Sequence, residues 1–565
     1  MNDDIVLVPA PRRIVREAGA LPLAPRGRLP VSAGPDVLAG AGPGLSAEAY
    51  RLVVTPASVR IEAADAAGAF YAKATLEQLV RACREQAKIP AMTIEDAPDF
   101  PERGVMLDVS RDKVPTMASL RGTIDLLAAL KINRLQLYVE HTFAYPQHPR
   151  VWRDASPLTG DEFELLDAYA RERFIELVPN QNSFGHMERW LRLPEYAPLA
   201  EVAEPEGEYM SLCPIDPRST TLLEGLYDAY LPHFTSRSFN VGCDETIDLG
   251  KGRSAPEVAA RGVGRVYLDF LLKIHALVSE RGRRMQFWGD IVLEHPELIR
   301  ELPRDVVALN WGYEADHPFA AEGARFAEAG LTYQVCPGTS SWLSLAGRTS
   351  NAMGNLESAA RAGRANGASG MLVTDWGDHG HWQPWPVSFL GLAYGAAMAW
   401  CGEANQDLDI AAALDLHVFR DEGRVLGVLA RDLGDVHLET GVTPKNASVL
   451  ALLLLFPERP LGEGRLAGLT IEGLERTMAA TDRIVGTLAL ARSTRPDARL
   501  VGEELRLAAD LVRLACRVGI ARLETGVYRG GSDVEELTAR YRRIWLERNR
   551  EGGLDDSVAR LERLK

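Results

Sequence analysis

Phe239-Asn240-Val241-Gly242-Cys243-Asp244-Glu245-Thr246 is an apolar, strand-like run that stops abruptly at two adjacent carboxylates. Like charges placed side by side cost free energy, and the cost grows when the groups are buried. Consecutive side chains of a strand point to opposite faces, so this pair can share one pocket only where the strand gives way to a loop. That geometry suits a general acid beside a group that stabilises charge. The alternative is structural: Asp244 can cap a helix that begins near Thr246.

Eight short apolar runs of this kind recur along the middle of the chain, each followed by a polar or aromatic residue or by cysteine. They are 104–107, 134–139, 174–178, 239–243, 285–287, 306–309, 331–335 and 371–373. Helical patterns separate most of them, at 117–130, 161–173, 220–230, 266–281, 319–329 and 356–365. Strands that alternate with helices indicate a parallel sheet. Eight such units in about 250–300 residues predict an α/β protein with a (β/α)8 TIM barrel.

The predicted barrel covers residues 99–415 and has a smaller domain on each side. Residues 1–98 combine a hairpin-like alternation with one helical pattern, which predicts an N-terminal α+β domain. Residues 416–565 carry mostly amphipathic helical patterns and predict a C-terminal α-helical domain. This last domain either packs on the barrel or mediates self-association, so a homodimer through its helices is a further expectation.

Composition narrows the class of partner. The 565 residues include 63 Lys and Arg against 78 Asp and Glu, a net charge of −15, which argues against nucleic acid and anionic membranes. The N-terminus lacks a basic, apolar leader, and the apolar stretch 449–456 is far shorter than the ~20 residues that span a bilayer. Six scattered cysteines without a C-x-x-C pair fit a reducing compartment. We therefore expect a cytoplasmic protein, with secretion left open if a leader has been trimmed.

Tryptophans gather at the predicted mouth of the barrel. They are Trp288, Trp311 and Trp376 at strand ends and Trp342 in a following loop. Single indoles are usually core residues, but several around one mouth indicate a box for a flat, apolar ring face such as that of a sugar. Asp378 follows Trp376 closely and can accept hydrogen bonds from hydroxyl groups. The alternative for this stretch is a metal site formed by Asp378, His379 and His381.

His186 follows the third predicted strand and is a further candidate. A lone histidine is often a packing residue, but this one lies where barrel enzymes place their chemistry. Glu140 or His141, at the neighbouring strand end, can orient its ring.

These residues resemble the family 20 glycoside hydrolases, the β-N-acetylhexosaminidases. The resemblance rests on 66–76 in the N-terminal domain, then on RGVMLDVSR at 103–111, KIN at 131–133, GH at 185–186 and GCDE at 242–245. The stretches NQNSFGH at 180–186 and TDWGD at 374–378 are similar to a bacterial branch related to the hexosaminidase D group. The order of the motifs on a predicted barrel makes the resemblance specific.

The resemblance implies a mechanism in which the substrate's 2-acetamido oxygen attacks the anomeric carbon. Glu245 would protonate the leaving oxygen and then activate water, while Asp244 would hold the acetamido N–H and stabilise an oxazolinium intermediate. A nucleophile within the substrate has a high effective molarity, and the anomeric configuration would be retained. No metal and no cofactor are implied.

The resemblance also implies roles for residues around the sugar. Arg103 would contact the O3 and O4 hydroxyls, Asp378 would accept from O4 or O6, and Trp288, Trp311 and Trp376 would line the pocket. The family's Tyr-Leu-Asp motif is missing from 333–342, where it would supply a donor to the acetamido oxygen. Tyr313 is a candidate substitute.

The sequence thus predicts a retaining exo-β-N-acetylhexosaminidase acting on an amino-sugar glycoside with terminal GlcNAc or GalNAc. One alternative is a non-catalytic sugar-binding barrel, which the intact acid pair argues against. Another is a metal-dependent barrel hydrolase, which the missing H-x-H after the first strand argues against.

Overall fold

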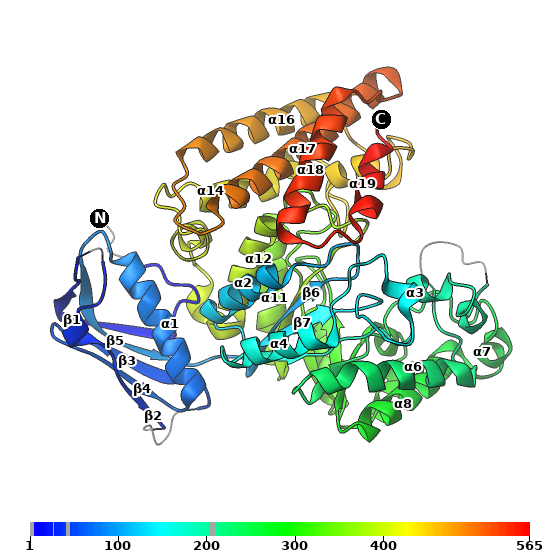
Figure 1. Ribbon diagram of the computed structural model, residues 1–565, viewed down its shortest axis with the longest axis horizontal. Helices are drawn as coiled ribbons and strands as arrows, with labels where there is room; N and C mark the ends of the chain where they lie inside the picture. Colours follow the sequence, from blue (N-terminus) through cyan, green and yellow to red (C-terminus); the bar gives the residue numbers. More distant parts are fainter. Residues whose placement is uncertain (1–4, 26, 41–45, 204–209) are drawn as a thin grey trace.

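Three parts of the chain are visible in the computed structural model, which describes residues 5–25, 27–40, 46–203 and 210–565. Figure 1 shows a sheet domain at the N-terminus, a barrel in the middle of the chain, and helices of the C-terminal part stacked on the barrel.

The N-terminal domain is a five-stranded sheet covered by one long helix. Its strands are β1 (Arg13–Pro22), β2 (Asp36–Ala39), β3 (Tyr50–Val54), β4 (Val59–Ala63) and β5 (Lys88–Asp96). They lie in the order β1-β5-β3-β4-β2, and the pairing is antiparallel except between β2 and β4. Helix α1 (Ala66–Ala82) begins at Asp65, whose side chain accepts a hydrogen bond from the Gly68 amide and caps the helix.

The barrel consists of eight parallel strands, as the sequence predicts. They are β6 (Glu102–Asp108), β7 (Arg134–Tyr138), β8 (Glu176–Val178), β9 (Ser238–Asn240), β10 (Arg284–Trp288), β11 (Val307–Trp311), β12 (Thr332–Cys336) and β13 (Gly370–Asp375). Their order in the sheet is β8-β7-β6-β13-β12-β11-β10-β9. Between β8 and β9 the described backbone is joined by one bridge, Asn180 to Asn240.

Carboxamides fill the barrel next to this closing bridge. Gln136 on β7 accepts hydrogen bonds from the side chains of Asn240 (2.9 Å) and Asn180 (3.3 Å), and it donates to Gln286 on β10 (2.9 Å). The two shortest strands of the barrel are therefore joined by side-chain amides through Gln136 as well as by backbone hydrogen bonds at the bridge.

Helices follow most strands and surround the barrel. They are α2 (Met117–Ala129), α3 (Pro149–Trp152), α4 (Gly160–Arg171), α5 (Glu188–Leu191), α6 (Pro217–Tyr230), α7 (Ala255–Arg261), α8 (Val263–Glu280), α9 (Asp290–Glu294), α10 (Phe319–Glu328), α11 (Thr349–Ala365), α12 (Phe389–Cys401) and α13 (Ile410–Ala413). Helix α4 begins with a capping box between Thr159 and Glu162.

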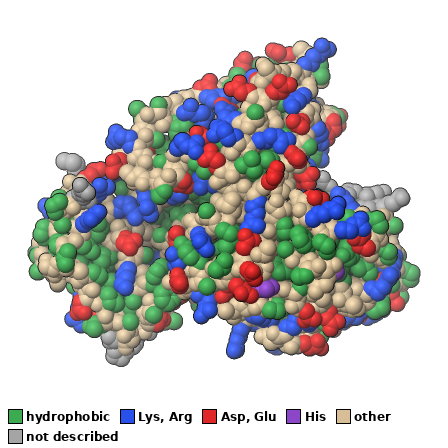
Figure 2. All heavy atoms as spheres, viewed as in Figure 1, with side chains coloured by type: hydrophobic (Ala, Val, Ile, Leu, Met, Phe, Trp, Pro, Cys, Tyr) green, Lys and Arg blue, Asp and Glu red, His purple; other side chains and the backbone are tan. Residues whose placement is uncertain are grey.

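The C-terminal part is helical, as predicted. Its helices are α14 (Leu426–Asp435), α15 (Val449–Leu455), α16 (Ile471–Gly486), α17 (Ala498–Thr525), α18 (Ser532–Arg548) and α19 (Leu554–Glu562). Figure 2 shows Lys, Arg, Asp and Glu side chains interspersed over their outer surface. Their buried residues, such as Leu505 and Leu561, belong to the same hydrophobic core as the barrel, whereas the N-terminal sheet has its own core. Among the described residues, none of the helices combines the length and the apolar character that crossing a bilayer requires.

Candidate active site

The two acids share one pocket at the mouth of the barrel. Asp244 and Glu245 follow β9, and one carboxylate oxygen of each lies 3.4 Å and 3.5 Å, respectively, from Nε2 of His186. Asp244 is buried, whereas the Glu245 side chain is 35% exposed and can reach a ligand. No helix begins at Thr246, and the next helix along the chain is α7 at Ala255, so Asp244 does not act as a helix cap.

Backbone conformation brings the acids to the same side. Gly242, Cys243 and Glu245 all have positive φ values, of 69°, 73° and 47°. A side chain at Gly242 would collide with the carboxamide of Asn182 and would also disfavour this conformation. The turn therefore depends on glycine at this position. It ends the alternation of side chains between two faces that a continued strand would impose on Asp244 and Glu245.

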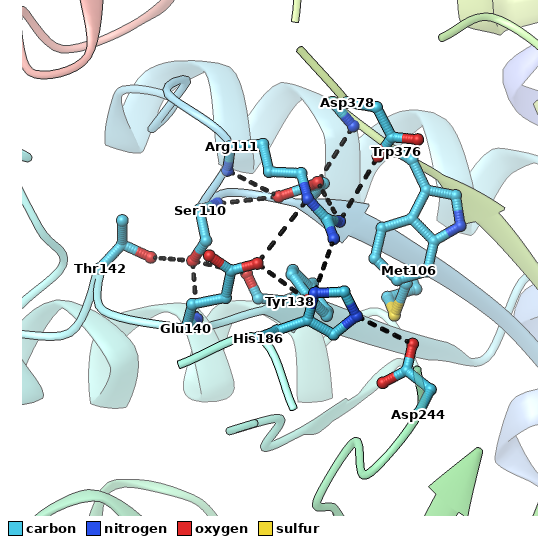
Figure 3. A network of polar contacts seen from close by, with 12 residues as sticks. Met106, Ser110, Arg111, Tyr138, Glu140, Thr142, His186, Asp244, Trp376 and Asp378 are labelled. Carbon is cyan, nitrogen blue, oxygen red and sulfur yellow. Dashed lines mark hydrogen bonds and ion pairs between the residues drawn. The ribbon is translucent and has the colours of Figure 1, made fainter. Parts of the chain in front are cut away.

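His186 connects the acid pair to a second cluster of charges (Figure 3). Its Nδ1 lies 3.4 Å from Nη2 of Arg111. Burial lowers the pKa of His186, but the Asp244 carboxylate outweighs burial and the pKa is raised to about 9. The ring therefore carries a positive charge near neutral pH, opposite both carboxylates.

The Glu245 carboxyl group holds its proton more tightly than an ordinary glutamate. Burial, followed by the neighbouring charge of Asp244, raises its pKa above the usual range for glutamate. Oδ1 of Asp244 is buried and makes no hydrogen bond within the described chain. The pocket thus holds a carboxyl group able to keep a proton and a carboxylate oxygen ready for a donor from outside the protein.

Arg111 is the centre of the second cluster and comes from the loop that follows β6. Its guanidinium lies 3.1 Å from Asp108, 3.6 Å from Asp378 and 3.7 Å from Glu140. It also packs 4.9 Å from the ring centroid of Trp376. Burial raises the pKa of Glu140 to about 7, while Arg111 opposes that rise. Glu140, and not His141, is therefore the neighbouring strand-end residue that borders the His186 network.

The predicted tryptophans meet in one aromatic cluster. Trp376 lies 6.0 Å from Trp288, and Trp342 lies 5.0 Å from Tyr313, measured between ring centroids. Trp311 stacks on Tyr313 at 5.2 Å. The Nε1 groups of Trp288, Trp311 and Trp342 have no hydrogen-bond partner within the described chain. The box therefore offers both ring faces and unused N–H donors.

Tyr313 is placed to donate a hydrogen bond into this box. Its hydroxyl accepts the N–H of Trp376 at 2.8 Å, a bond that does not use the tyrosine proton. Burial raises the pKa of Tyr313 well above its ordinary value, so the hydroxyl stays protonated.

Arg103 is not part of the site, which corrects the sequence-based prediction. It lies at the N-terminal end of β6, is fully buried, and pairs with Glu48 of the N-terminal domain at 2.6 Å. Its guanidinium also lies 4.8 Å from the ring centroid of Trp400. Both arginines fall within the same motif, but only Arg111 follows the carboxyl end of the strand, where barrel chemistry is found. That rule would have selected Arg111 from the sequence.

Two further features were not predicted. Asp290, two residues after Trp288, accepts a hydrogen bond from the Glu245 amide at 3.2 Å, and burial raises its pKa to about 8. Among the described residues, the group able to hold a metal ion is His186, Asp244 and Glu245. Asp378, His379 and His381 do not bring their ligand atoms together in such a group among the described residues. The alternative of a metal site in this stretch therefore has no geometric basis.

Comparison with known proteins shows that most of the first 388 residues match two domains of one enzyme family. Residues 100–388 match the catalytic domain of glycosyl hydrolase family 20, and residues 13–97 match domain 2 of that family. A β-hexosaminidase of Akkermansia muciniphila is 28% identical over 287 residues, covering 45% of this chain and 58% of that protein. Hexosaminidase D of Bos taurus is 27% identical over 211 residues, covering 36% of this chain and 60% of that protein.

The fold is shared with solved structures. The structure of a Flavobacterium johnsoniae chitobiase matches with a TM-score of 0.60 at 16% identity and covers 94% of this chain and 95% of that chain. The chain spans about half the length of the curated relatives it matches first. The catalytic-domain match alone nevertheless extends over more than half of the present sequence. The chain therefore belongs to glycosyl hydrolase family 20.

Proposed function

We propose that the protein is a retaining exo-β-N-acetylhexosaminidase that releases terminal, non-reducing β-linked GlcNAc or GalNAc by substrate-assisted catalysis. The observation that carries the proposal is the acid pair: Asp244 and Glu245 face one pocket, with an unused buried oxygen on Asp244. Two adjacent acids on one side of a bond cannot flank it as an acid and a nucleophile would. The nucleophile then has to come from the substrate.

In the first step the acetamido carbonyl oxygen of the sugar forms a bond to the anomeric carbon. The Glu245 carboxyl group gives its proton to the glycosidic oxygen as the bond to the aglycone breaks. Oδ1 of Asp244 accepts the acetamido N–H, orients the nucleophile and stabilises the positive oxazolinium ring.

In the second step water attacks the anomeric carbon and reopens the ring. Glu245, now a carboxylate, takes the proton from that water and is ready for another cycle. Two displacements at the same carbon retain the β configuration. His186 supports both steps, because its positive ring lies opposite the carboxylates and limits their mutual repulsion.

The rest of the pocket fits the sugar. Arg111 can donate to ring hydroxyls and Asp378 can accept from them, at the same end of the pocket. Trp288, Trp311, Trp342 and Trp376 surround the ring and the acetamido methyl group, and Tyr313 donates to the acetamido oxygen. A cytoplasmic location and a homodimer through residues 416–565 stay predictions.

The test is turnover of aryl β-N-acetylglucosaminides with poor and good leaving groups. Glu245→Gln should lower kcat/KM by about 10²–10⁴-fold for a poor leaving group. The loss should be much smaller for a dinitrophenyl leaving group, because that group departs without a proton. Asp244→Asn should slow both substrates, because it acts on the acetamido group. Glu172→Gln, an exposed acid at the end of α4, is the matched control.

Two results would contradict the proposed mechanism, and a third would contradict hydrolysis altogether. One is turnover at the wild-type rate in both Glu245→Gln and Asp244→Asn, which would place the reaction at another site. The other is equal turnover of a plain β-glucoside, which has no acetamido group to attack. Sugar binding by the wild type without any hydrolysis would indicate a binding barrel instead.

A further inference from the structure

A cavity of about 520 Å³ lies between the barrel and the C-terminal helices, apart from the acid pair. Its walls come from α2, from the loop after β13, and from α17 and α18. Figure 1 shows α2 beneath α17 and α18. Of the residues around Arg111, only Asp108 also borders this cavity, and neither Asp244 nor Glu245 does. Its size suits a small organic molecule.

Two side chains on the cavity wall, Lys113 and His381, have hydrogen-bonding capacity that the described chain does not use. The Lys113 ammonium donates to the Gln383 carbonyl at 3.0 Å and lies 5.0 Å from the ring centroid of Trp545, with no hydrogen-bonded carboxylate. His381 is 9% exposed, and its Nδ1 is buried without a hydrogen-bond partner within the described chain. Burial lowers the pKa of Lys113 to about 7 and keeps that of His381 far below its ordinary value.

The acids near Lys113 are already engaged. Glu504 accepts two hydrogen bonds from Arg548, at 2.9 Å and 2.7 Å. Asp375 accepts hydrogen bonds from Ser388 (3.0 Å) and from two hydroxyls of the β12–α11 loop. Neither carboxylate is within hydrogen-bond distance of Lys113, so the ammonium lacks a direct counter-charge.

The remaining walls are largely apolar and aromatic. Trp385, Phe389, Leu500 and Ile544 contribute flat or branched surfaces to them. The rim includes Ala118 and Gly122, which are exposed on α2. The opening is thus bordered by small side chains of one helix.

We propose that this cavity binds a small organic carboxylate with a flat apolar body, whose anionic end meets Lys113 and His381. A carboxylate there would complete the hydrogen bonds of both donors and supply the missing charge. The apolar body would cover the aromatic walls. An uncharged ring of the same size would lack the charged hydrogen bonds to Lys113 and His381, and an inorganic anion would leave the aromatic walls uncovered.

The test is calorimetric titration of the full chain with naphthoate at neutral pH. We expect one site per chain and weaker binding of naphthalenemethanol, which keeps the ring but not the charge. Lys113→Met should weaken naphthoate by about ten-fold or more, the effect of losing a charge-assisted hydrogen bond. Lys113→Arg should retain binding. Lys273→Met removes another lysine that donates to a backbone carbonyl and is the matched control.

Ala118→Trp provides a second variant that does not disturb the interior, because Ala118 is exposed on α2. It should narrow the opening and abolish binding while the circular dichroism spectrum is unchanged. The proposal fails if the wild type does not bind naphthoate, or if neither Lys113→Met nor Ala118→Trp weakens it. It also fails if a thiazoline analogue of GlcNAc displaces naphthoate, since binding would then be at the proposed catalytic pocket.

Discussion

Arg111 is the only guanidinium within reach of both Asp378 and Glu140 in the described pocket. It stacks between Trp376 and Tyr138, with ring centroids at 4.9 Å and 5.0 Å, so its orientation is fixed before a sugar enters. A donor that is already ordered loses little conformational freedom on binding. Much of the proposed affinity for ring hydroxyls should therefore depend on this side chain.

Substituting the two arginines of the β6 motif separates binding from stability. Arg111→Met should raise KM and lower kcat/KM by about 10–10³-fold, because charge-assisted hydrogen bonds to the sugar are lost. Arg103→Met should leave KM unchanged and lower the free energy of unfolding by about 3 kcal/mol, because Glu48 loses its buried partner. Steady-state kinetics and urea unfolding measure the two effects. An increase in KM for Arg103→Met alone would mean that Arg103, and not Arg111, contacts the sugar.

The charge on His186 should be visible in the pH dependence of stability. The folded-state pKa, about 9, lies above the ordinary value of 6.5, so the ring's contribution is complete below pH 6.5 and is lost as pH rises towards 9. For a fully buried ring the difference amounts to about 3 kcal/mol. The free energy of unfolding of the wild type minus that of His186→Gln should therefore shrink over this range. A constant difference would mean that the ring is neutral in the folded protein.

At the residue scale, the sequence was most informative where chemistry and pattern coincide. Asp244, Glu245 and His186 follow strands and meet in the structure, and the Tyr138 ring lies between His186 and Trp376. The family resemblance alone points to Arg103, which lies at the N-terminal end of its strand and pairs with Glu48. Asp290 could not be found from the pattern, because its contact with the Glu245 backbone depends on how two loops meet.

At the scale of elements, α19 supports the loop that carries Asp378. His379, Gly380 and His381 all have positive φ values, of 57°, 103° and 52°, which cost free energy for residues other than glycine. Ser557 on α19 donates to the Gly380 carbonyl, and its own carbonyl accepts the Trp382 N–H at 3.1 Å. Residues 389–565 lie outside the matched family domains, so this support comes from a part of the chain beyond those two domains.

Removing the Ser557 hydroxyl should alter selectivity as well as stability. Ser557→Ala should cost about 1–2 kcal/mol and change the ratio of kcat/KM for GlcNAc and GalNAc substrates, which differ at O4. Thr538→Val removes a buried hydroxyl on α18 that donates to the Val534 carbonyl at 2.7 Å and is the matched control. It should cost similar stability and leave the ratio unchanged. Equal ratios in both variants would make Ser557 a packing residue only.

Element boundaries differ from the sequence pattern where tertiary packing decides them. The pattern predicts a helix over 356–365, but α11 begins seven residues earlier, at Thr349. Asn355 within that extension is buried and donates to the carbonyls of Gly312 and Glu314, each at 2.9 Å, which a pattern of apolar spacing cannot reveal.

At the scale of the whole molecule, a buried ion pair joins the N-terminal domain to the barrel. Lys131 donates to Asp96 and to the Tyr50 hydroxyl, both at 2.9 Å, and the two charged side chains are fully buried. Trp400 of α12 donates to the same carboxylate at 2.9 Å. The barrel and the N-terminal sheet could be predicted from the sequence, but this junction could not, because its partners lie far apart in the chain.

Breaking this junction should destabilise the protein strongly. Asp96→Asn leaves a buried ammonium without its counter-charge and should cost about 3–5 kcal/mol, measured by urea unfolding. The adjacent Glu95→Gln removes only surface pairs with Arg13 and Arg51 and should cost less than about 1 kcal/mol. Equal losses in the two variants would show that the buried pair contributes no more than the exposed one.

The carboxamides at the closing bridge have a consequence for how the pocket can be adjusted. Asn240 ends the three-residue strand β9, and four residues later the chain reaches Asp244. Its amide donates to Gln136 on β7, across the bridge, so the strand that leads to the acids is held at this point by a side chain as well as by its backbone. Substituting Asn240 or Gln136 is therefore a way to adjust the strand that carries Asp244 and Glu245 while leaving both of them in place.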